Sequence, residues 1–451
     1  MKRGTEAVAV ALLLSGPVAA HPGSPPVELN DIPLAGGGRQ THEVVLRSGD
    51  ALRGTVDQQG IDVVVKVRRP DGGVALEVDS PNGTEGPEPV ALIATTAGTY
   101  VVEVSALDAN APAGRYHLRL EAPRAATRAD REAAEALALH IRAFTARNEA
   151  LALMGQARYE PSAARYAEAE NWARRALELR ERTLGAEHYD VAATLQVLGL
   201  VADEIGDYAE GERHFARAYR ILERLLGPGH PGLLTTQSDL GYLRLATGDY
   251  AGAEALFTGA LSRHEELYGR ESERLLAGLG GLTEALLKQG QLERAETVAR
   301  RVLAIREAVR QPSPVSLTSL GLVVLARGRT AEAEAACGQA RAAAEARRDS
   351  GSTQLASSLL CLGRARHAAG DAAGAAPLLA EGVQIREAAY GPDHPSLAEA
   401  LAAHGQALAA QGAAKPALAR FQRALAIQQR RLGSSHPATR ETAEALRALD
   451  K

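Results

Sequence analysis

Two stretches of the sequence match at a fixed distance: LGLVADEIGDY at residues 198–208 and LGYLRLATGDY at residues 240–250, 42 residues later. Repetition with such a period indicates units that are too small to bury a core alone and that stack on their neighbours. A column of residues expected to end helices follows the same spacing, with one step shortened to 38 residues. This column reads Ala164, Gly206, Gly248, Gly290, Gly328, Gly370 and Gly412. We therefore predict a stack of helical repeats.

Small residues recur at two further places in each repeat. Helices that approach closely need small side chains where their axes cross, so these columns mark the expected contacts between paired helices. The column in the first helix reads Gly199, Gly241, Thr283, Gly321, Gly363 and Gly405. One column in the second helix reads Ala169, Gly211, Ala253, Ala295, Ala333, Ala375 and Ala417.

These columns resemble the tetratricopeptide repeat, and the 42-residue period with its Gly-x-x-His-Pro connector is similar to the kinesin-light-chain type. The resemblance covers residues 163–449 and implies a right-handed superhelix of antiparallel helix pairs with a concave groove. We expect an all-α solenoid over residues 127–451, with about seven helix pairs and a C-terminal capping helix. The resemblance does not imply an enzyme.

The N-terminus has the three regions of a secretory signal. Lys2 and Arg3 precede an apolar run at residues 7–14, and Val18 and Ala20 occupy the small-residue positions before a cleavage site. The apolar run is too short to span a bilayer, which needs ~20 residues. We predict a signal peptide at residues 1–20, cleaved after Ala20, and a linker rich in Pro and Gly at residues 21–38. The protein is then exported, periplasmic or secreted, with no membrane span or lipid anchor.

Residues 39–122 change to a period of two and predict an all-β sandwich that precedes the solenoid. Turn signals such as Pro70-Asp71-Gly72-Gly73 separate the runs. The succession that includes Ala97-Gly98-Thr99-Tyr100 and Gly114-Arg115-Tyr116 resembles the bacterial pre-peptidase C-terminal domain. The expected strands are residues 43–46, 51–56, 62–67, 74–78, 90–94, 100–104 and 116–120.

Metal ligands are considered at two places, and we expect a metal at neither. Asp71, Asp79 and Glu85 could ligate calcium, but Asp beside Gly usually forms turns. Histidines that recur at the 42-residue period, with its one step of 38, suggest zinc, but they are spread along a solenoid, whereas zinc ligands converge. Pro follows three of them, which places His at a helix N-cap and Pro at the first helical position. These histidines are His188, His230, His394 and His436.

Charge and motifs exclude several classes of function. The 451 residues include 51 basic and 55 acidic side chains, for a net charge of −4, which argues against nucleic acid as a partner. Phosphate loops, His-Glu-x-x-His and Gly-x-Ser-x-Gly are absent. Many bacterial relatives of this layout continue into a CHAT protease domain, whereas Lys451 follows the last repeat by one helix. We expect a non-enzymatic protein without a cofactor.

Two functions remain open from the sequence. The first is an extracytoplasmic scaffold or adaptor that binds a protein or peptide in the groove, and the second is a regulatory or targeting subunit of a separately encoded hydrolase. Cys337 and Cys361 lie in helices of neighbouring repeats. We expect two free thiols, because buried Cys is commonly a small hydrophobe and a bridge needs Cα atoms within ~7 Å.

The family resemblance also implies which residues line the groove, since the first helix of each repeat faces it. The kinesin-light-chain type usually has an Asn pair just before Leu-Gly, which has no counterpart here. A basic clamp for a C-terminal carboxylate is also missing. We predict an amphipathic ligand anchored on Tyr242, Leu245, Leu287 and Leu322, with little dependence on salt. Alternatively, these leucines only pack neighbouring helices. The groove candidates are Gln196, Leu200, Asp203, Ser238, Tyr242, Leu245, Glu284, Leu287, Lys288, Leu322, Arg364 and His367.

Overall fold

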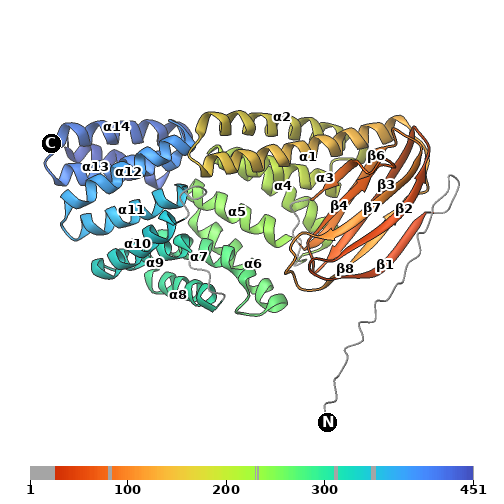
Figure 1. The fold of residues 1–451 in the computed structure, drawn as a ribbon. Coiled ribbons are helices and arrows are strands. Elements are labelled where there is room, and N and C mark those ends of the chain that lie inside the picture. The colour runs from red at the N-terminus through yellow and green to blue at the C-terminus, as the bar shows by residue number, and fades with distance from the viewer. Residues whose placement is uncertain are drawn as a thin grey trace, which may run out of the picture. The chain divides into compact units, whose positions relative to one another are not determined.

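The computed structural model describes residues 26–79, 84–228, 230, 233–308, 313–346 and 352–449. The predicted signal peptide and its cleavage after Ala20 lie outside these residues. The chain divides into two compact units, residues 1–138 and 139–451, and each is described by itself (Figure 1).

Two antiparallel sheets form the β unit (Figure 1). One sheet has the order β1-β8-β3-β6, with β9 paired to β3, and the other has the order β2-β7-β4-β5. Tyr100, Tyr116 and Leu52 are buried in its core. All seven predicted strands are confirmed, as β2 to β8. The strands are β1 Val27–Leu34, β2 Arg39–Leu46, β3 Asp50–Gln59, β4 Val63–Arg68, β5 Val74–Val78, β6 Glu85–Ile93, β7 Gly98–Ala106, β8 Gly114–Leu120 and β9 Arg124–Ala125.

The predicted linker at residues 21–38 is wrong over β1, because the sandwich begins at Val27 rather than at residue 39. β1 pairs with β8 from Val27↔Leu120 to Leu34↔Gly114, and a bulge lies between Leu29 and Ile32. The Pro-rich composition is compatible with a strand because β1 is an edge strand, where Pro removes no ladder hydrogen bond. The bulge interrupts the alternation that would have identified the strand.

The described helices form seven pairs and one further helix, and all but the first part of α1 lie in the second unit (Figure 1). A short 3-10 helix, η2, precedes α7. The helices are α1 Arg128–Gly155, α2 Tyr159–Leu184, α3 Tyr189–Glu204, α4 Tyr208–Leu226, α5 Leu234–Thr247, α6 Tyr250–Tyr268, η2 Glu273–Leu275, α7 Leu276–Lys288, α8 Leu292–Ala308, α9 Pro314–Ala326, α10 Thr330–Glu345, α11 Ser352–Ala368, α12 Ala372–Tyr390, α13 Pro395–Ala410, α14 Ala414–Arg431 and α15 Pro437–Leu449.

Left-handed backbone ends the first helix of each pair. From Gly206 to Gly412 the six glycines of the predicted column have φ between 75° and 88°, a conformation that only Gly adopts without strain. The prediction is wrong for Ala164, which lies inside α2. There the left-handed residue is Ala157, with φ 56°, and Pro161 lies in the first turn of α2, where its missing N–H removes no helical bond.

Glycines of the first-helix column let the paired helices interlock. A Cβ on Gly199 would lie 2.6 Å from the Phe215 ring, and one on Gly241 would lie 2.8 Å from the Phe257 ring. Phe215 and Phe257 are 1% and 0% exposed. The small column therefore accommodates a large side chain of the partner helix and fixes how each pair crosses.

Candidate functional site

Three neighbouring cavities lie along the helical unit, lined mainly by first helices from α5 to α15 and in part by second helices. Their volumes are about 400, 360 and 350 Å³. Ser319 and Gln354 line both the first and the second cavity, and Lys288 and Arg364 line both the first and the third. The shared lining residues place the three cavities next to one another, and we call the three together the central tract.

A carboxylate held by two arginines forms one wall of the central tract. Glu399 on α13 contacts Arg364 Nη2 on α11 at 2.9 Å and Arg386 Nη1 on α12 at 2.7 Å. Burial raises the pKa of Glu399, but Arg386, Arg364 and Lys288 outweigh burial and hold it well below its usual range. Glu399 is therefore a fixed anion that orients both guanidinium groups.

A second carboxylate of the central tract, Glu284, forms no ion pair with another described residue within hydrogen-bond reach. The side chain of Glu284 on α7 is exposed, but the protein around it reduces its solvation. This desolvation raises the pKa of Glu284, and the nearby Lys288 opposes the shift. Lys288 lies one helical turn further along α7 and is exposed. The tract thus offers one loosely held carboxylate and one exposed ammonium group beside the paired Arg364, Arg386 and Glu399.

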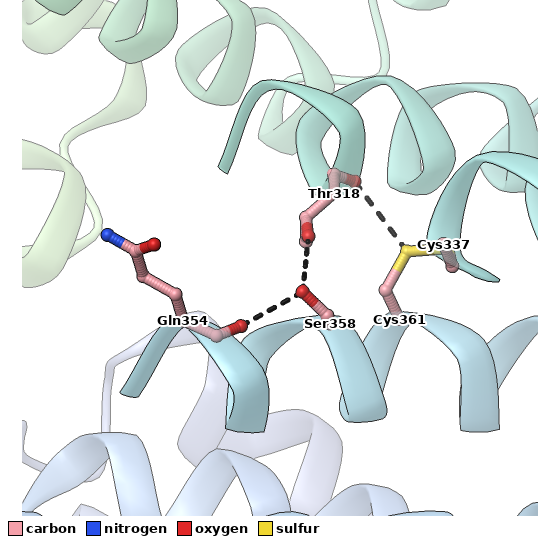
Figure 2. Close-up of a disulfide and its surroundings, with 5 residues drawn as sticks. All are labelled: Thr318, Cys337, Gln354, Ser358 and Cys361. Atoms are coloured by element: carbon pink, nitrogen blue, oxygen red, sulfur yellow. Dashed lines mark hydrogen bonds between the residues drawn. A yellow bond between two sulfur atoms is a disulfide. The ribbon is translucent and has the colours of Figure 1, made fainter. Parts of the chain in front are cut away.

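Hydroxyl and amide groups of α9 and α11 line the opposite wall. Ser357 Oγ donates to the Thr353 carbonyl at 3.1 Å, and Thr318 Oγ1 lies 3.3 Å from Ser358 Oγ. The side-chain amide of Gln354 has no hydrogen-bond partner among the described residues, and Figure 2 shows it pointing away from its own helix. An amide that both donates and accepts suits the backbone of a polypeptide ligand.

The structure brings six of the predicted groove residues to the central tract. Tyr242 lines the 360 Å³ cavity, where its hydroxyl donates to the Ala277 carbonyl at 2.7 Å. The others line the 400 Å³ cavity, and they are Glu284, Leu287, Lys288, Leu322 and Arg364. This part of the groove is more polar than the sequence predicted, because Arg386 adds a charge from α12.

The other predicted groove residues do not line the described cavities. Gln196 is 7% exposed and donates to Thr236 Oγ1 at 2.6 Å, and Ser238 is 9% exposed and donates to the Leu234 carbonyl at 2.9 Å. Leu245 packs in the core with Phe257. The packing alternative is therefore the better description of Leu245.

Leu200, Asp203 and His367 are also absent from the walls of these cavities. Leu200 packs against the core cluster around Phe215. Burial raises the pKa of Asp203 to about 6, although Arg147 opposes the shift. His367 Nδ1 is buried without a hydrogen-bond partner among the described residues.

The repeat geometry agrees with a comparison with known families. The family model described as tetratricopeptide repeat matches residues 148–210, 204–258, 234–308 and 354–430, which is more than half of the chain. The chain belongs to the tetratricopeptide-repeat family. No curated protein matches it.

Several solved structures are similar to this tetratricopeptide-repeat protein. Kinesin-light-chain TPR-like repeats of Podosopora anserina match at 21% identity over 54% of this chain and 98% of that chain, with a TM-score of 0.27. BtubC (BKLC) of P. vanneervenii matches at 20% identity over 51% and 91%, with a TM-score of 0.38. A Rap protein complexed with competence and sporulation factor matches at 11% identity over 68% and 97%, with a TM-score of 0.43.

A disulfide joins the fifth and sixth tetratricopeptide repeats, so the prediction of two free thiols is wrong. Cys337 on α10 and Cys361 on α11 have Cα atoms 5.6 Å apart (Figure 2). A Cβ on Gly321 would lie 2.5 Å from Cys337 Sγ. Cys337 therefore occupies the position where Phe215 and Phe257 fill the crossing in earlier repeats. Because Cys337 is smaller, the bridge to Cys361 completes the packing there.

The sequence analysis missed the contribution of the second helices to the tract. Arg386 and Tyr390 come from α12, whereas only first helices were considered. The sequence does contain a signal for Arg386, since an arginine, Arg180, also occupies the equivalent position of the first repeat. Both are buried, and each donates to the backbone carbonyl ten residues later, at Asp190 for Arg180 and at Ser396 for Arg386.

Metal and membrane sites were also considered. The described residues contain no group of three or more His, Cys, Asp or Glu side chains that could hold a metal ion. Asp71, one of the possible calcium ligands, accepts the N–H of Gly73 at 2.9 Å as a turn residue. Within the described part of the chain, no helix is long and apolar enough to cross a membrane.

Proposed function

We propose that this tetratricopeptide-repeat protein is a non-enzymatic scaffold that holds a segment of another protein in the central tract. The adjacency of the three cavities carries the proposal, since neighbouring cavities along successive repeats offer successive pockets to one polypeptide segment. The predicted signal peptide supports an exported scaffold, outside the cytoplasm, and its β-sandwich then supplies a second contact or sets its position.

The walls of the tract define the chemistry of the ligand. Leu287 and Leu322 offer apolar contacts, while Gln354 offers a donor and an acceptor to a peptide backbone. Lys288 and Glu284 add one charge of each sign. The ligand is then an extended segment with apolar side chains at intervals, oriented by polar contacts to Lys288 and Gln354. Because charges line the tract, affinity should depend moderately on salt, in contrast to the sequence-based prediction.

Peptides selected from a random display library on the full-length protein test this proposal. Ser319 lines both larger cavities and is half-buried, so the Trp ring of Ser319→Trp should occupy the space where the two cavities adjoin. We expect the selected peptides to lose at least about tenfold in affinity, while melting temperature stays the same.

The matched control is Arg213→Trp, which places the same ring on α4 at a side chain that is 74% exposed. Binding should be unchanged in this variant. Peptides that bind Ser319→Trp as tightly as the unmodified protein would show that they bind outside the tract, and the proposal would be wrong.

A further inference from the structure

A line of contacts runs through the helical unit where one turn of the superhelix meets the next. Ser352 Oγ donates to the Gly155 carbonyl, Gly391 lies against the Tyr159 ring, and Gly206 and Gly248 lie against the starts of α13 and α15. We call these contacts the seam. Its two sides are residues 155–159, 206–208 and 248, and residues 352, 390–395 and 436–437.

Two contacts of the seam are the same contact repeated. Gly206 faces His394-Pro395, and 42 residues further along on both sides Gly248 faces His436-Pro437. A Cβ on Gly206 would lie 2.7 Å from Pro395 Cδ, and a Cβ on Gly248 would lie 3.0 Å from Pro437 Cδ. At these two positions Gly is required both for positive φ and for the close approach of the connector.

The histidine ring packs between the two turns of the superhelix. His394 is 5% exposed, and its ring stacks on Tyr390 at 4.5 Å and meets Tyr208 edge-on at 6.3 Å. Its Nδ1 accepts the N–H of Ser396 at 3.1 Å, so in the neutral ring the proton is on Nε2. Nε2 faces the turn at Gly206, at the end of α3, where helical carbonyls lack partners within the helix.

His436 repeats this arrangement at the next turn. It is 8% exposed, and its Nδ1 accepts the N–H of Ala438 at 3.2 Å. Nε2 of His394 faces the backbone carbonyl of Glu204 and Nε2 of His436 faces that of Ala246, and each ring is further held by packing and by its Nδ1 bond. Each histidine thus begins one helix and covers the end of another helix that is distant in the sequence.

We propose that the His394-Pro395 and His436-Pro437 connectors form a latch that holds successive turns of the superhelix together and closes the central tract from the side. Capping alone does not account for the contact. His188 caps α3 with the same bond, at 3.1 Å from the N–H of Asp190, yet its side chain is 44% exposed. The part of the proposal that concerns access to the tract rests on the proposed function.

Positive φ does not account for the contact either. Gly290, Gly328, Gly370 and Gly412 have φ between 75° and 88°, as Gly206 and Gly248 do, but a Cβ on them would meet nothing within 4 Å. The latch is therefore specific to the two interhelical turns, at Gly206 and Gly248, that a His-Pro connector contacts. A segment that enters the tract from the side has to release it, whereas one that enters along the superhelix axis does not.

The combined variant His394→Asn with His436→Asn tests the latch in the full-length protein without any ligand. Asn still caps a helix N-terminus but lacks the ring. Hydrogen exchange of amides 155–159 and 390–396 should become roughly tenfold faster, because an aromatic pair and its buried contacts are lost. Small-angle scattering should show a larger maximum dimension. His188→Asn is the control and should change neither measurement.

A second pair of variants separates the latch from general damage to the fold. Gly206→Ala with Gly248→Ala forces a side chain into the seam, whereas Gly290→Ala with Gly412→Ala introduces the same backbone strain into open turns. Only the first pair should speed exchange at the seam and expand the protein. If both pairs behave alike, or if the asparagine variant exchanges at the original rate, the latch proposal is wrong. If the natural protein showed an intact seam but bound no peptide in the central tract, the proposed function alone would be contradicted.

Discussion

Replacing Cys337 and Cys361 by serine should destabilise the helical unit locally, because the disulfide joins two consecutive repeats. The bridge closes a loop with a sequence separation of 24. Closing such a loop in the unfolded chain corresponds to about 3 kcal/mol of stability in the chain-entropy account. The loss acts between α10 and α11, because each repeat of a solenoid is stabilised by its neighbours.

The expected size of the effect follows from this loop and from the crossing at Gly321. A loss of about 3 kcal/mol lowers the melting temperature of a domain of this size by about 6 °C. Calorimetry with and without reductant measures the shift. The reduced natural protein should have the same melting temperature as the serine variant. Hydrogen exchange should quicken over α9, α10 and α11 and remain unchanged over α1 and α2.

An unreduced protein that has the mass of two free thiols would refute the reasoning. So would a serine variant with the original melting temperature, since the bridge would then contribute nothing to the junction of the two repeats.

Two further predictions follow from the crossings and from the seam. Gly199→Ala should lower the free energy of unfolding by about 1–3 kcal/mol, because a Cβ there overlaps Phe215. Gly338→Ala on α10, where a Cβ meets open space, should raise the free energy of unfolding by about 0.5–1 kcal/mol. Urea unfolding measures both, and equal effects would contradict the close packing described at Gly199. Burial, followed by Arg386 and Arg431, lowers the pKa of His394 to about 3, and a hydrogen bond to the Glu204 backbone opposes this shift. Between pH 6.5 and 3 the unfolded state therefore binds a proton that the folded state does not, so the stability of the fold falls as pH decreases. At pH 5 the natural protein should lose about 2 kcal/mol more, relative to pH 8, than His394→Asn, and an equal loss in both would show that His394 does not titrate as described.

The sequence predicted most of the fold because its repeats constrain every helix several times. The glycine column located the ends of six first helices, since the left-handed turn needs Gly wherever it occurs. It failed at the first repeat, where Ala157 takes the left-handed conformation and the period no longer applies. The strand at residues 27–34 was missed because a bulge and Pro33 hide its alternation.

The candidate site was less predictable, because it depends on contacts between residues that are distant in the sequence. Counting positions along first helices located Glu284, Lys288 and Arg364, but not Arg386 on α12. The bridge between Cys337 and Cys361 depends on the small side chain at one crossing, which the period alone does not reveal. The seam was invisible for the same reason, since the period does not determine how many repeats complete one turn of the superhelix.

Photo-crosslinking from residue 354 tests the central claim most directly. The Gln354 side chain lines the two largest described cavities and has no hydrogen-bond partner among the described residues, so a benzophenone amino acid at this position should crosslink a peptide selected on the full-length protein. The same amino acid in place of exposed Arg213 on α4 should not. Crosslinks from position 354, located in the peptide by mass spectrometry and absent at position 213, are the predicted result, whereas crosslinks from position 213 alone would contradict binding in the central tract.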